Sequence, residues 1–393
     1  MRLAILEQSF GRFGGAERLA LAHYQQLKKM NVDAELFYGG AISDEWKARL
    51  GNLGLRPLTA GIPRNLKELR FLKDLLRALS HFDRILIHHH IEPILAFYIT
   101  ELFGRKTIWY SGSVLEFAWE EFITGLDYRS ISPTVKKTSQ DFYGRPFSSV
   151  ALSDLTFNDA VRMARLLDVR SVKRCRKVLA NSRFLSKFLF DIYGLGDFPP
   201  VVYPGPDPIL KQLSYSLPAA EEEYMLTVAP FIPMKNIESV VLAAAAIPSS
   251  TIVAIGDGQD RERIRGLAEQ ERVEFRLLPA SPDESKLASS YSKCKFLVHL
   301  SLYEPFGLTV VEAGLFGKPS IVTNRGGPPE VVVDGQTGFI VNPRDVKQVT
   351  MRMKELLAND ALRHEMGMKA RLRVLENFTI EKSTTDLLAE VES

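Results

Sequence analysis

The segment YEPFGLTVVE at 303–312 holds two acids and joins an apolar run to a stretch of helical spacing. Glu304 would lie in the loop at the carboxyl end of a strand. Glu312 would lie one turn into the following helix, where a carboxylate can accept two hydrogen bonds from a ribose diol. Free backbone N–H groups at a helix start suit a diphosphate, and here they would belong to Phe306, Gly307 and Leu308. The order of strand, acid, glycine turn, helix and second acid disfavours the alternative of ordinary surface acids.

Further candidates follow other apolar runs. Lys235 comes after EYMLTV (223–228), where a lysine can neutralise a phosphate and help a diphosphate leave; taken alone, it is more typical of a solvated surface. Gly256 follows another run and either shapes a pocket or simply turns the chain. A third run ends in Arg325 and a glycine pair that can approach a transferred group closely, Gly326 and Gly327.

An early loop also carries adjacent glycines, Gly14 and Gly15, with Gly11 just before them. They open a stretch of helical period at 17–30. Backbone without side chains can contact a ligand closely, and a helix start can bind phosphate. A plain turn is an equally good interpretation of these glycines.

Short apolar runs alternate with helical stretches twice along the chain, before and after the proline-rich segment VVYPGPDP at 201–208. Such alternation is typical of parallel sheets covered by helices, and the prolines and glycine mark a linker. The sequence therefore predicts an α/β fold of two doubly wound, Rossmann-like domains. Their ligands should bind at the carboxyl ends of the strands, in a cleft where the domains face each other.

The composition excludes several classes of protein. The chain of 393 residues has a formal net charge of only +3, so a strong polyanion partner such as nucleic acid is not expected. Its two cysteines form neither a disulfide framework nor a zinc pattern, which fits a reducing compartment. MRLAILEQSF at the start is typical of a first strand rather than a signal peptide, and no apolar run is long enough for a membrane span.

Taken together, these residues resemble glycosyltransferase family 4, of the GT-B architecture. The resemblance rests on an ordered set of motifs that extends over nearly the whole chain: GGAE (14–17), ANS (180–182), Lys235, GDG (256–258), the E-x7-E pair Glu304 and Glu312, and GGPPE (326–330). It implies an acceptor-binding domain at 1–203, a nucleotide-sugar domain at 204–379 and a final helix at 380–393 that crosses back to the first domain. The implied activity is retaining transfer of a hexose, with neither metal nor cofactor.

The resemblance also implies roles for individual residues. Glu304 would contact the hydroxyls of the donor sugar, Glu312 the ribose and Lys235 the diphosphate. Backbone N–H groups of residues 306–308 would hold the diphosphate, and Gly14 and Gly15 would close over the phosphates. The donor base stays open among GDP, UDP and ADP.

Two departures from the family pattern stand out. Ala229 and Pro230 occupy the places of a usual Gly-Arg pair, so one cation for the diphosphate is missing; Arg325 is a candidate replacement. Many members also carry a histidine after a strand of the N-terminal domain, and none stands near 109–113. His88, His89 and His90 follow the preceding strand and are candidates to point to the cleft instead. Successive residues of an extended chain point alternately, so the three are not expected to chelate one metal ion.

The acceptor would be a glycan or a lipid-linked sugar, since GGAERLA looks like members that mannosylate lipid-linked oligosaccharides. An aromatic-rich stretch at 109–122 and a basic run at 162–187 are the candidate contacts. The basic run would suit an anionic membrane surface, which predicts a cytoplasmic protein, peripheral at the inner face of the membrane; the alternative is a solvated helix face. Two other functions stay open: a non-catalytic protein that binds a sugar nucleotide or glycan, and another GT-B enzyme such as an epimerase or a phosphorylase.

Overall fold

The computed structural model describes residues 1–8, 14–39, 42, 46, 56–58, 66–113, 157–217, 222–279 and 283–393. The chain divides into two compact units. Unit 1 comprises Met1–Tyr203 with Ser383–Ser393, and unit 2 comprises Pro204–Lys382. Gly11 and residues 114–122 of the aromatic stretch lie outside the described residues. Within the described part, no helix has the length and apolar character needed to cross a membrane.

Unit 1 is built on a parallel sheet of six strands in the order β3-β2-β1-β4-β5-β6. Its central strands are buried on both faces, which explains why runs such as RILIH are apolar without alternation. The strands are β1 (Arg2–Glu7), β2 (Asp33–Gly39), β3 (Arg56–Leu58), β4 (Arg84–His88), β5 (Thr107–Ser111) and β6 (Lys177–Ala180).

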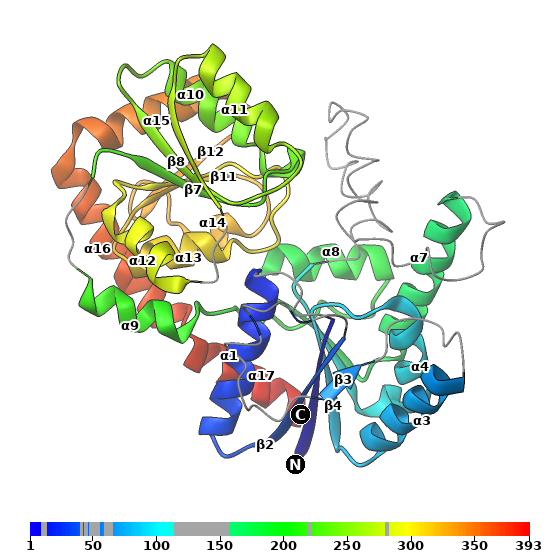
Figure 1. Cartoon of the computed structure of the whole chain (residues 1–393). Helices are drawn as coiled ribbons and strands as arrows, with labels where there is room; N and C mark the ends of the chain where they lie inside the picture. The colour runs from blue at the N-terminus through cyan, green and yellow to red at the C-terminus, as the bar shows by residue number, and fades with distance from the viewer. Residues whose placement is uncertain are drawn as a thin grey trace. The chain divides into compact units, whose positions relative to one another are not determined.

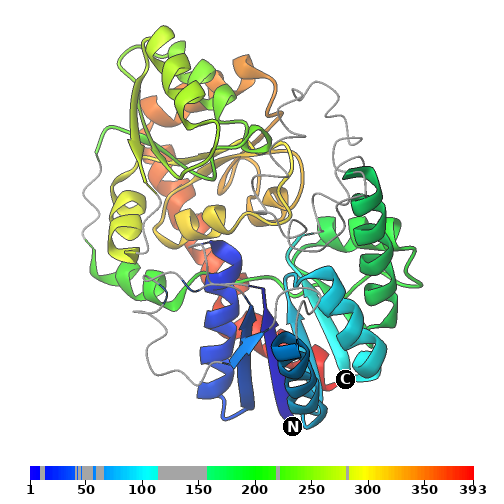
Figure 2. The same cartoon turned by 45° about the vertical axis from the view of Figure 1, so that its right-hand side comes forward.

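Helices cover both faces of this sheet. Figure 1 shows α1 and α17 on one face, and α3, α4 and α7 on the other, and the turned view in Figure 2 agrees. The helical elements of unit 1 are α1 (Gly15–Lys29), α3 (Leu66–Ser80), α4 (Pro93–Phe103), η1 (Gly104–Lys106), α7 (Phe157–Arg174) and α8 (Arg183–Tyr193), together with α17 (Ile380–Glu392) from the chain end.

The chain end is bonded into unit 1 by polar contacts of α17. Arg84 Nε donates to the carbonyl of Val391 at 3.0 Å, and Lys177 Nζ pairs with Glu390 at 2.9 Å. In the interior, His23 Nε2 lies 2.9 Å from Ser383 Oγ. The last helix therefore packs on α1 although more than 350 residues separate His23 from Ser383 along the chain.

Unit 2 repeats the same design with strand order β12-β11-β10-β7-β8-β9. Numbered from its own first strand, this is the order 3-2-1-4-5-6 of a doubly wound fold, as in unit 1. The strands are β7 (Met225–Val228), β8 (Thr251–Ile255), β9 (Glu274–Leu278), β10 (Leu297–His299), β11 (Ser320–Thr323) and β12 (Gly338–Val341).

Packing of α10, α11 and α15 on one face of the second sheet forms the main apolar core of unit 2. On the opposite face, α13 packs on α16. The helical elements are α9 (Pro208–Ser216), η2 (Pro233–Lys235), α10 (Ile237–Ala245), α11 (Arg261–Gln270), α12 (Glu284–Lys293), α13 (Leu308–Leu315), α14 (Pro328–Val331), α15 (Val346–Ala358) and α16 (Asp360–Asn377).

Candidate active site

The switch point of the second sheet lies between β7 and β10, because the chain proceeds outward from these two strands in opposite directions. Loops that leave a switch point diverge and open a crevice at the carboxyl ends of the strands. The loop after β7 carries Lys235, and the loop after β10 carries Glu304. Two residues that stand 69 positions apart in the sequence thus meet at one edge of the sheet.

Lys235 Nζ donates to Glu304 Oε2 at 2.8 Å. The two side chains are 17% and 16% exposed, so both are shielded yet reachable from solvent. The buried His299 places Nε2 at 3.3 Å from the same carboxylate oxygen, and its Nδ1 lies 3.3 Å from Thr309 Oγ1. The site therefore holds one cation, one anion and a histidine that the sequence analysis did not select.

The electrostatics keep Glu304 ionised. Burial by itself raises the pKa of this carboxyl, but the positive charge of Lys235 and the contact with His299 outweigh burial and hold the pKa well below its ordinary value. A carboxylate in this state can accept hydrogen bonds from hydroxyl groups. A lysine ammonium beside it can pair with an incoming anion.

The start of α13 has the geometry that the sequence predicts. Gly307 caps the helix with φ 101°, a conformation that favours glycine, and Leu308 is the first helical residue. Phe306 is buried, and its ring lies 5.8 Å from that of Phe378. The backbone of residues 306–308 is thereby fixed at the amino end of a helix, the end that favours an anion.

Gly326 and Gly327 pack against the loop that carries Glu304. A Cβ on Gly326 would lie 2.1 Å from the carbonyl oxygen of Glu304, and one on Gly327 would lie 2.3 Å from that of Pro305. The backbone N–H of Gly327 donates to the Glu304 carbonyl at 2.9 Å. The protein itself therefore requires these glycines, and the predicted approach to a transferred group stays a prediction.

Gly256 has a similar use beside the loop after β7. Its φ is 154°, and a Cβ there would lie 2.0 Å from the carbonyl oxygen of Ala229. Arg261 Nη1 donates to the Gly256 carbonyl at 3.1 Å. Pro230, which stands where the family has arginine, is exposed. Arg325 is partly buried, and its backbone N–H donates to Thr323 Oγ1 at 3.2 Å.

Glu312 is buried inside unit 2, with 1% of the residue exposed. Tyr291 donates its hydroxyl to Glu312 Oε2 at 2.7 Å, and its ring stacks on Phe316 at 5.7 Å between ring centroids. One carboxylate oxygen is thus held by a fixed phenol. The sequence gives no direct sign of this pair, because Tyr291 lies in a different helix, α12.

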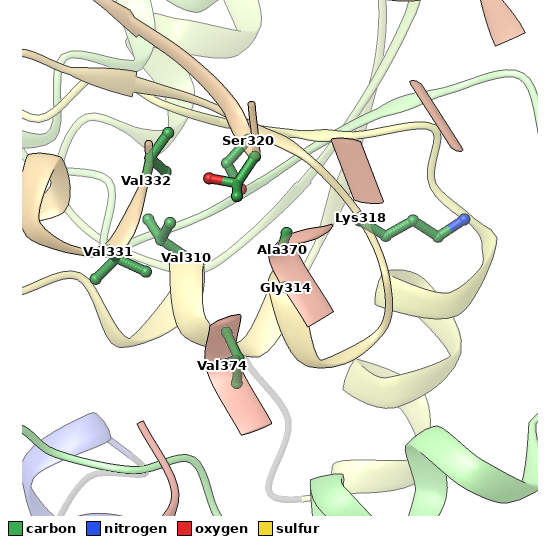
Figure 3. Close-up of a pocket in the computed structure, with 9 residues that line it drawn as sticks. Val310, Gly314, Lys318, Ser320, Val331, Val332, Ala370 and Val374 are labelled. Atoms are coloured by element: carbon green, nitrogen blue, oxygen red, sulfur yellow. The ribbon is translucent and has the colours of Figure 1, made fainter. Parts of the chain in front are cut away.

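The cavity in Figure 3 is too small to hold a nucleotide. It lies between α13 and α16 and is lined mainly by Val310, Val331, Val332 and Val374, while the Lys318 chain runs away from the valines. Its volume is about 10 Å³, which is room for a single water molecule. We interpret it as a packing void of the apolar interior.

Gly14 and Gly15 belong to unit 1 and are described at the start of α1. Gly14 caps the helix with an extended backbone, and its carbonyl accepts from the N–H of Arg18 at 3.3 Å. Among the described residues, a Cβ on Gly14 would lie nearest the flexible carboxylate of Glu17, at 2.4 Å. The turn and the phosphate contact therefore both stay predictions for this glycine.

The three adjacent histidines serve different purposes. His88 is buried beside Glu7 and His23, with Nδ1 at 3.3 Å from Glu7 Oε2 and Nε2 at 3.1 Å from His23 Nδ1. His90 packs with its ring 5.3 Å from that of Trp109. His89 is the distinctive one: its φ is 68°, and a Cβ on Gly112 would lie 2.1 Å from its Nδ1. Burial lowers the pKa of His89 to about 4 and keeps its imidazole neutral.

His89 is held from several sides. Trp109 Nε1 donates to its carbonyl at 2.5 Å, and its own N–H donates to the Tyr110 carbonyl at 2.8 Å. A left-handed backbone at a residue other than glycine is strained and tends to occur at functional sites. Of the three histidines, His89 is the one with a strained backbone, directly after β4.

The predicted basic run is partly neutralised in the structure. Arg170 and Arg174 of α7 both pair with Glu101 of α4, at 2.6 and 3.4 Å. The side chain of Arg162 lies outside the described residues. Apolar side chains are exposed on the same helix, with Met163 at 49% and Leu166 at 67%.

Comparisons with known proteins show what part of the chain is similar to them. Residues 213–373 match the family model described as glycosyl transferases group 1. The chain is 31% identical to N-acetyl-alpha-D-glucosaminyl L-malate synthase of Bacillus anthracis over 41% of the chain and 43% of that protein. It is 30% identical to O-antigen chain mannosyltransferase B of Escherichia coli over 46% of the chain and 48% of that protein. The chain thus spans about half the length of the curated relatives it matches.

The fold extends further than the sequence similarity. Over the whole chain the structure resembles that of Anabaena HepE in complex with UDP-glucose, with a TM-score of 0.74 and 17% identity, covering 100% of both chains. The predicted α/β fold class of two Rossmann-like doubly wound domains, of the GT-B type, is confirmed. The matched segment 213–373 contains Lys235, Glu304 and Glu312.

Proposed function

We propose that the protein is a glycosyltransferase that moves a hexose from a nucleotide-diphosphate sugar to a glycan or lipid-linked acceptor. The observation that carries this proposal is the pair of Lys235 and Glu304 at the switch point of unit 2, joined at 2.8 Å beside the start of α13. The cation and the backbone N–H groups at this helix start suit the diphosphate of such a donor, and the anion suits its sugar hydroxyls. The match of residues 213–373 to a glycosyltransferase family supports it.

Each residue then has a chemical task. The ammonium of Lys235, which pairs with Glu304 in the structure, also pairs with the diphosphate when the donor binds. It then stabilises the negative charge that develops as the diphosphate departs. Glu304, ionised throughout the physiological range, accepts hydrogen bonds from the sugar hydroxyls. The N–H groups of residues 306–308 bind phosphate oxygens, and Glu312 accepts from the ribose.

We further propose that transfer retains the anomeric configuration, on one face of the sugar. The departing phosphate takes the proton of the acceptor hydroxyl as the new glycosidic bond forms and the bond to phosphate breaks. This scheme needs no protein nucleophile, no metal and no cofactor. Neutral His89 is suited to orient a sugar hydroxyl, since an uncharged imidazole can both donate and accept a hydrogen bond.

The chemistry of the site supports a nucleotide-diphosphate sugar as the donor but does not select its sugar or its base. UDP-glucose is bound by the Anabaena protein, and a mannosyltransferase is among the relatives. Glucose and mannose are therefore the first sugars to test, on UDP, GDP or ADP. Neither protein identifies the nucleotide base of the donor. The similarity to HepE is a similarity of fold, and the chain matches only about half the length of the mannosyltransferase.

The test is binding followed by transfer. Calorimetry with UDP, GDP and ADP should show one preferred base, and the matching sugar conjugates should be consumed when a lipid-linked glycan is present. A ligand that binds only the folded protein raises its melting temperature, which gives a second readout. The proposal fails if none of the three nucleotides binds to the wild-type protein.

An anionic membrane surface is our proposed site of action, on the inner face of the cytoplasmic membrane. Support comes from α7, which exposes Met163 and Leu166 next to Arg170 and Arg174, and from two free cysteines, which fit a reducing compartment. Sedimentation with vesicles of phosphatidylglycerol should exceed that with phosphatidylcholine and decrease with salt. Equal sedimentation with both lipids would contradict binding through the negative charge of the membrane.

A specific observation favours a second candidate, a non-catalytic protein that binds a sugar nucleotide or glycan. Pro230 stands exposed where the family has an arginine, and one lost donor of this kind costs about 3–4 kcal/mol of transition-state stabilisation. This candidate predicts donor binding without turnover. Replacing Ala229→Gly and Pro230→Arg together should raise diphosphate affinity if the pocket is conventional, whereas a drop would mean that the pocket is built around the proline.

A further inference from the structure

Asn236 follows Lys235 directly, and its backbone is left-handed, with φ 51° and ψ 40°. It ends the short helix η2 and precedes the first residue of α10. Asparagine tolerates this conformation better than most residues other than glycine. The backbone alone would thus explain an asparagine or a glycine here, but it gives no reason for the amide group.

The amide of Asn236 has a structural use of its own. Its Nδ2 donates to the carbonyls of Leu300 at 3.1 Å and Pro343 at 3.0 Å. Its Oδ1 accepts from Ser239 Oγ at 2.9 Å. Both N–H groups are used, and they join the loop of Lys235 to the segments that follow β10 and β12.

These bonds bear on Lys235 from both sides. On the other flank, the carbonyl of Met234 accepts from the N–H of Leu302 at 2.8 Å. The residues before and after Lys235 are therefore both bonded to the segment that leads to Glu304. A lysine side chain has about 2 kcal/mol of rotamer entropy to lose, so its ammonium is held at one place only if its backbone is fixed as well.

We propose that Asn236 is a positioning residue: its amide fixes the loop after β7 so that Lys235 is presented to a diphosphate beside Glu304. The inference rests on the proposed function for the identity of the anion. Asn236 acts through Lys235 and has no contact with the ligand. Removing its amide should therefore matter only while Lys235 is present.

A double-mutant cycle measures this dependence. Asn236→Gly keeps the left-handed backbone accessible and removes the amide. Calorimetry with UDP, GDP and ADP identifies the base that the wild-type protein binds, and the same nucleotide is then used for Asn236→Gly, Lys235→Ala and the double variant. We expect Asn236→Gly to weaken nucleoside diphosphate binding about tenfold in the wild-type background, and less than about twofold in the Lys235→Ala background.

Ser239→Ala is the matched control, since it removes the partner of Oδ1 but leaves both donated bonds; it should change affinity by less than about twofold. Where Asn236→Gly does not fold, Asn236→Asp replaces it in the same cycle, because aspartate adopts the same backbone and cannot donate. Equal losses with and without Lys235 would show a general effect on the fold and overturn the inference. A wild-type protein that binds none of the three nucleotides would overturn the proposed function instead.

Discussion

The two units share one topology, yet their switch points hold opposite kinds of chemistry. In unit 1 the strands β1 and β4 end in Glu7 and His88, which lie 3.3 Å apart and are 3% and 1% exposed. In unit 2 the corresponding loops bring together Lys235 and Glu304, at 2.8 Å and 17% and 16% exposed. The ends of these two strands are sealed in unit 1, whereas the pair in the loops that follow the strands of unit 2 stays reachable from solvent.

What seals unit 1 is a chain of polar groups that needs no net positive charge. Glu7, His88, His23 and Ser383 follow one another at 3.3, 3.1 and 2.9 Å. Burial lowers the pKa of His88 to about 3, and burial together with His88 lowers that of His23. Neutral histidines can both donate and accept, so His88, His23 and Ser383 form a hydrogen-bonded chain, and Glu7 contacts its end at His88. Topology therefore sets where polar residues gather, and side-chain type decides whether they hold the chain end, as in unit 1, or stay reachable from solvent, as in unit 2.

The largest expected difference between the two units is in how much stability each loses in mild acid. His88 and His89, with pKa values lowered to about 3 and about 4, stay neutral near pH 5 when folded but bind protons when unfolded, and the pKa of His23 is lowered in the same direction. Unit 1 therefore keeps its full stability above about pH 6.5 and loses about 2 kcal/mol for each of His88 and His89 between pH 7 and pH 5. Glu304 has a lowered pKa and an ordinary value of 4.5, so unit 2 loses its contribution only at lower pH.

Hydrogen exchange measured at pH 7 and pH 5, corrected for the intrinsic rate, reads the two units separately. Amides of β1 and β4 should lose protection, while those of β7 and β10 should keep it. Equal loss in both sheets would contradict the assignment of neutral buried histidines to unit 1.

Lys235→Ala should have the next largest effect. It removes the cation from a site where Glu304 is nearly buried, and it leaves like charges to face each other when a diphosphate binds. Loss of one such group lowers kcat/KM by about 100-fold to 1,000-fold. Steady-state transfer with the preferred donor measures it. Lys211→Ala is the control, because that lysine also pairs with a glutamate, Glu381, at 2.9 Å, but away from the strand ends. Full activity of Lys235→Ala would refute the role.

Much of this arrangement could be predicted from sequence, because it depends on neighbours along the chain. The alternation of runs gave the strands, and Glu304 and Gly307 stand where a strand meets a helix. By contrast, Tyr291 and Glu312 belong to two helices, and His23 meets Ser383 across 360 positions. Such contacts form only when helices pack against each other, and the residue types and their spacing do not predict which helices do so. The reason why position 326 requires glycine could not be predicted either, because the backbone of Glu304 that packs against it is distant in the sequence.

Ser383→Ala tests whether the sealed switch point is structural. The hydroxyl lies 2.9 Å from His23 Nε2 in a fully buried place, so its removal should cost unit 1 about 1 kcal/mol of unfolding free energy. Urea unfolding at pH 7 measures the cost. Nucleoside diphosphate affinity should stay within about twofold, since Ser383 has no link to Lys235 in the described structure. A loss of affinity with unchanged stability would mean that the two switch points communicate.

Tyr291→Phe should have the smallest effect and the most specific one. It keeps the ring that stacks on Phe316 and removes the hydroxyl that holds Glu312 Oε2 at 2.7 Å. If Glu312 binds the ribose diol, the variant should weaken binding of the preferred nucleoside diphosphate about fivefold, but hardly change binding of its 2′-deoxy analogue. Tyr224→Phe is the matched control, because that hydroxyl also bonds α12, at the Ser290 carbonyl, without reaching Glu312. Equal weakening for the ribo and deoxy ligands would show that Tyr291 supports only the packing of α12, and unit 2 would then bind its ligand without a positioned ribose contact.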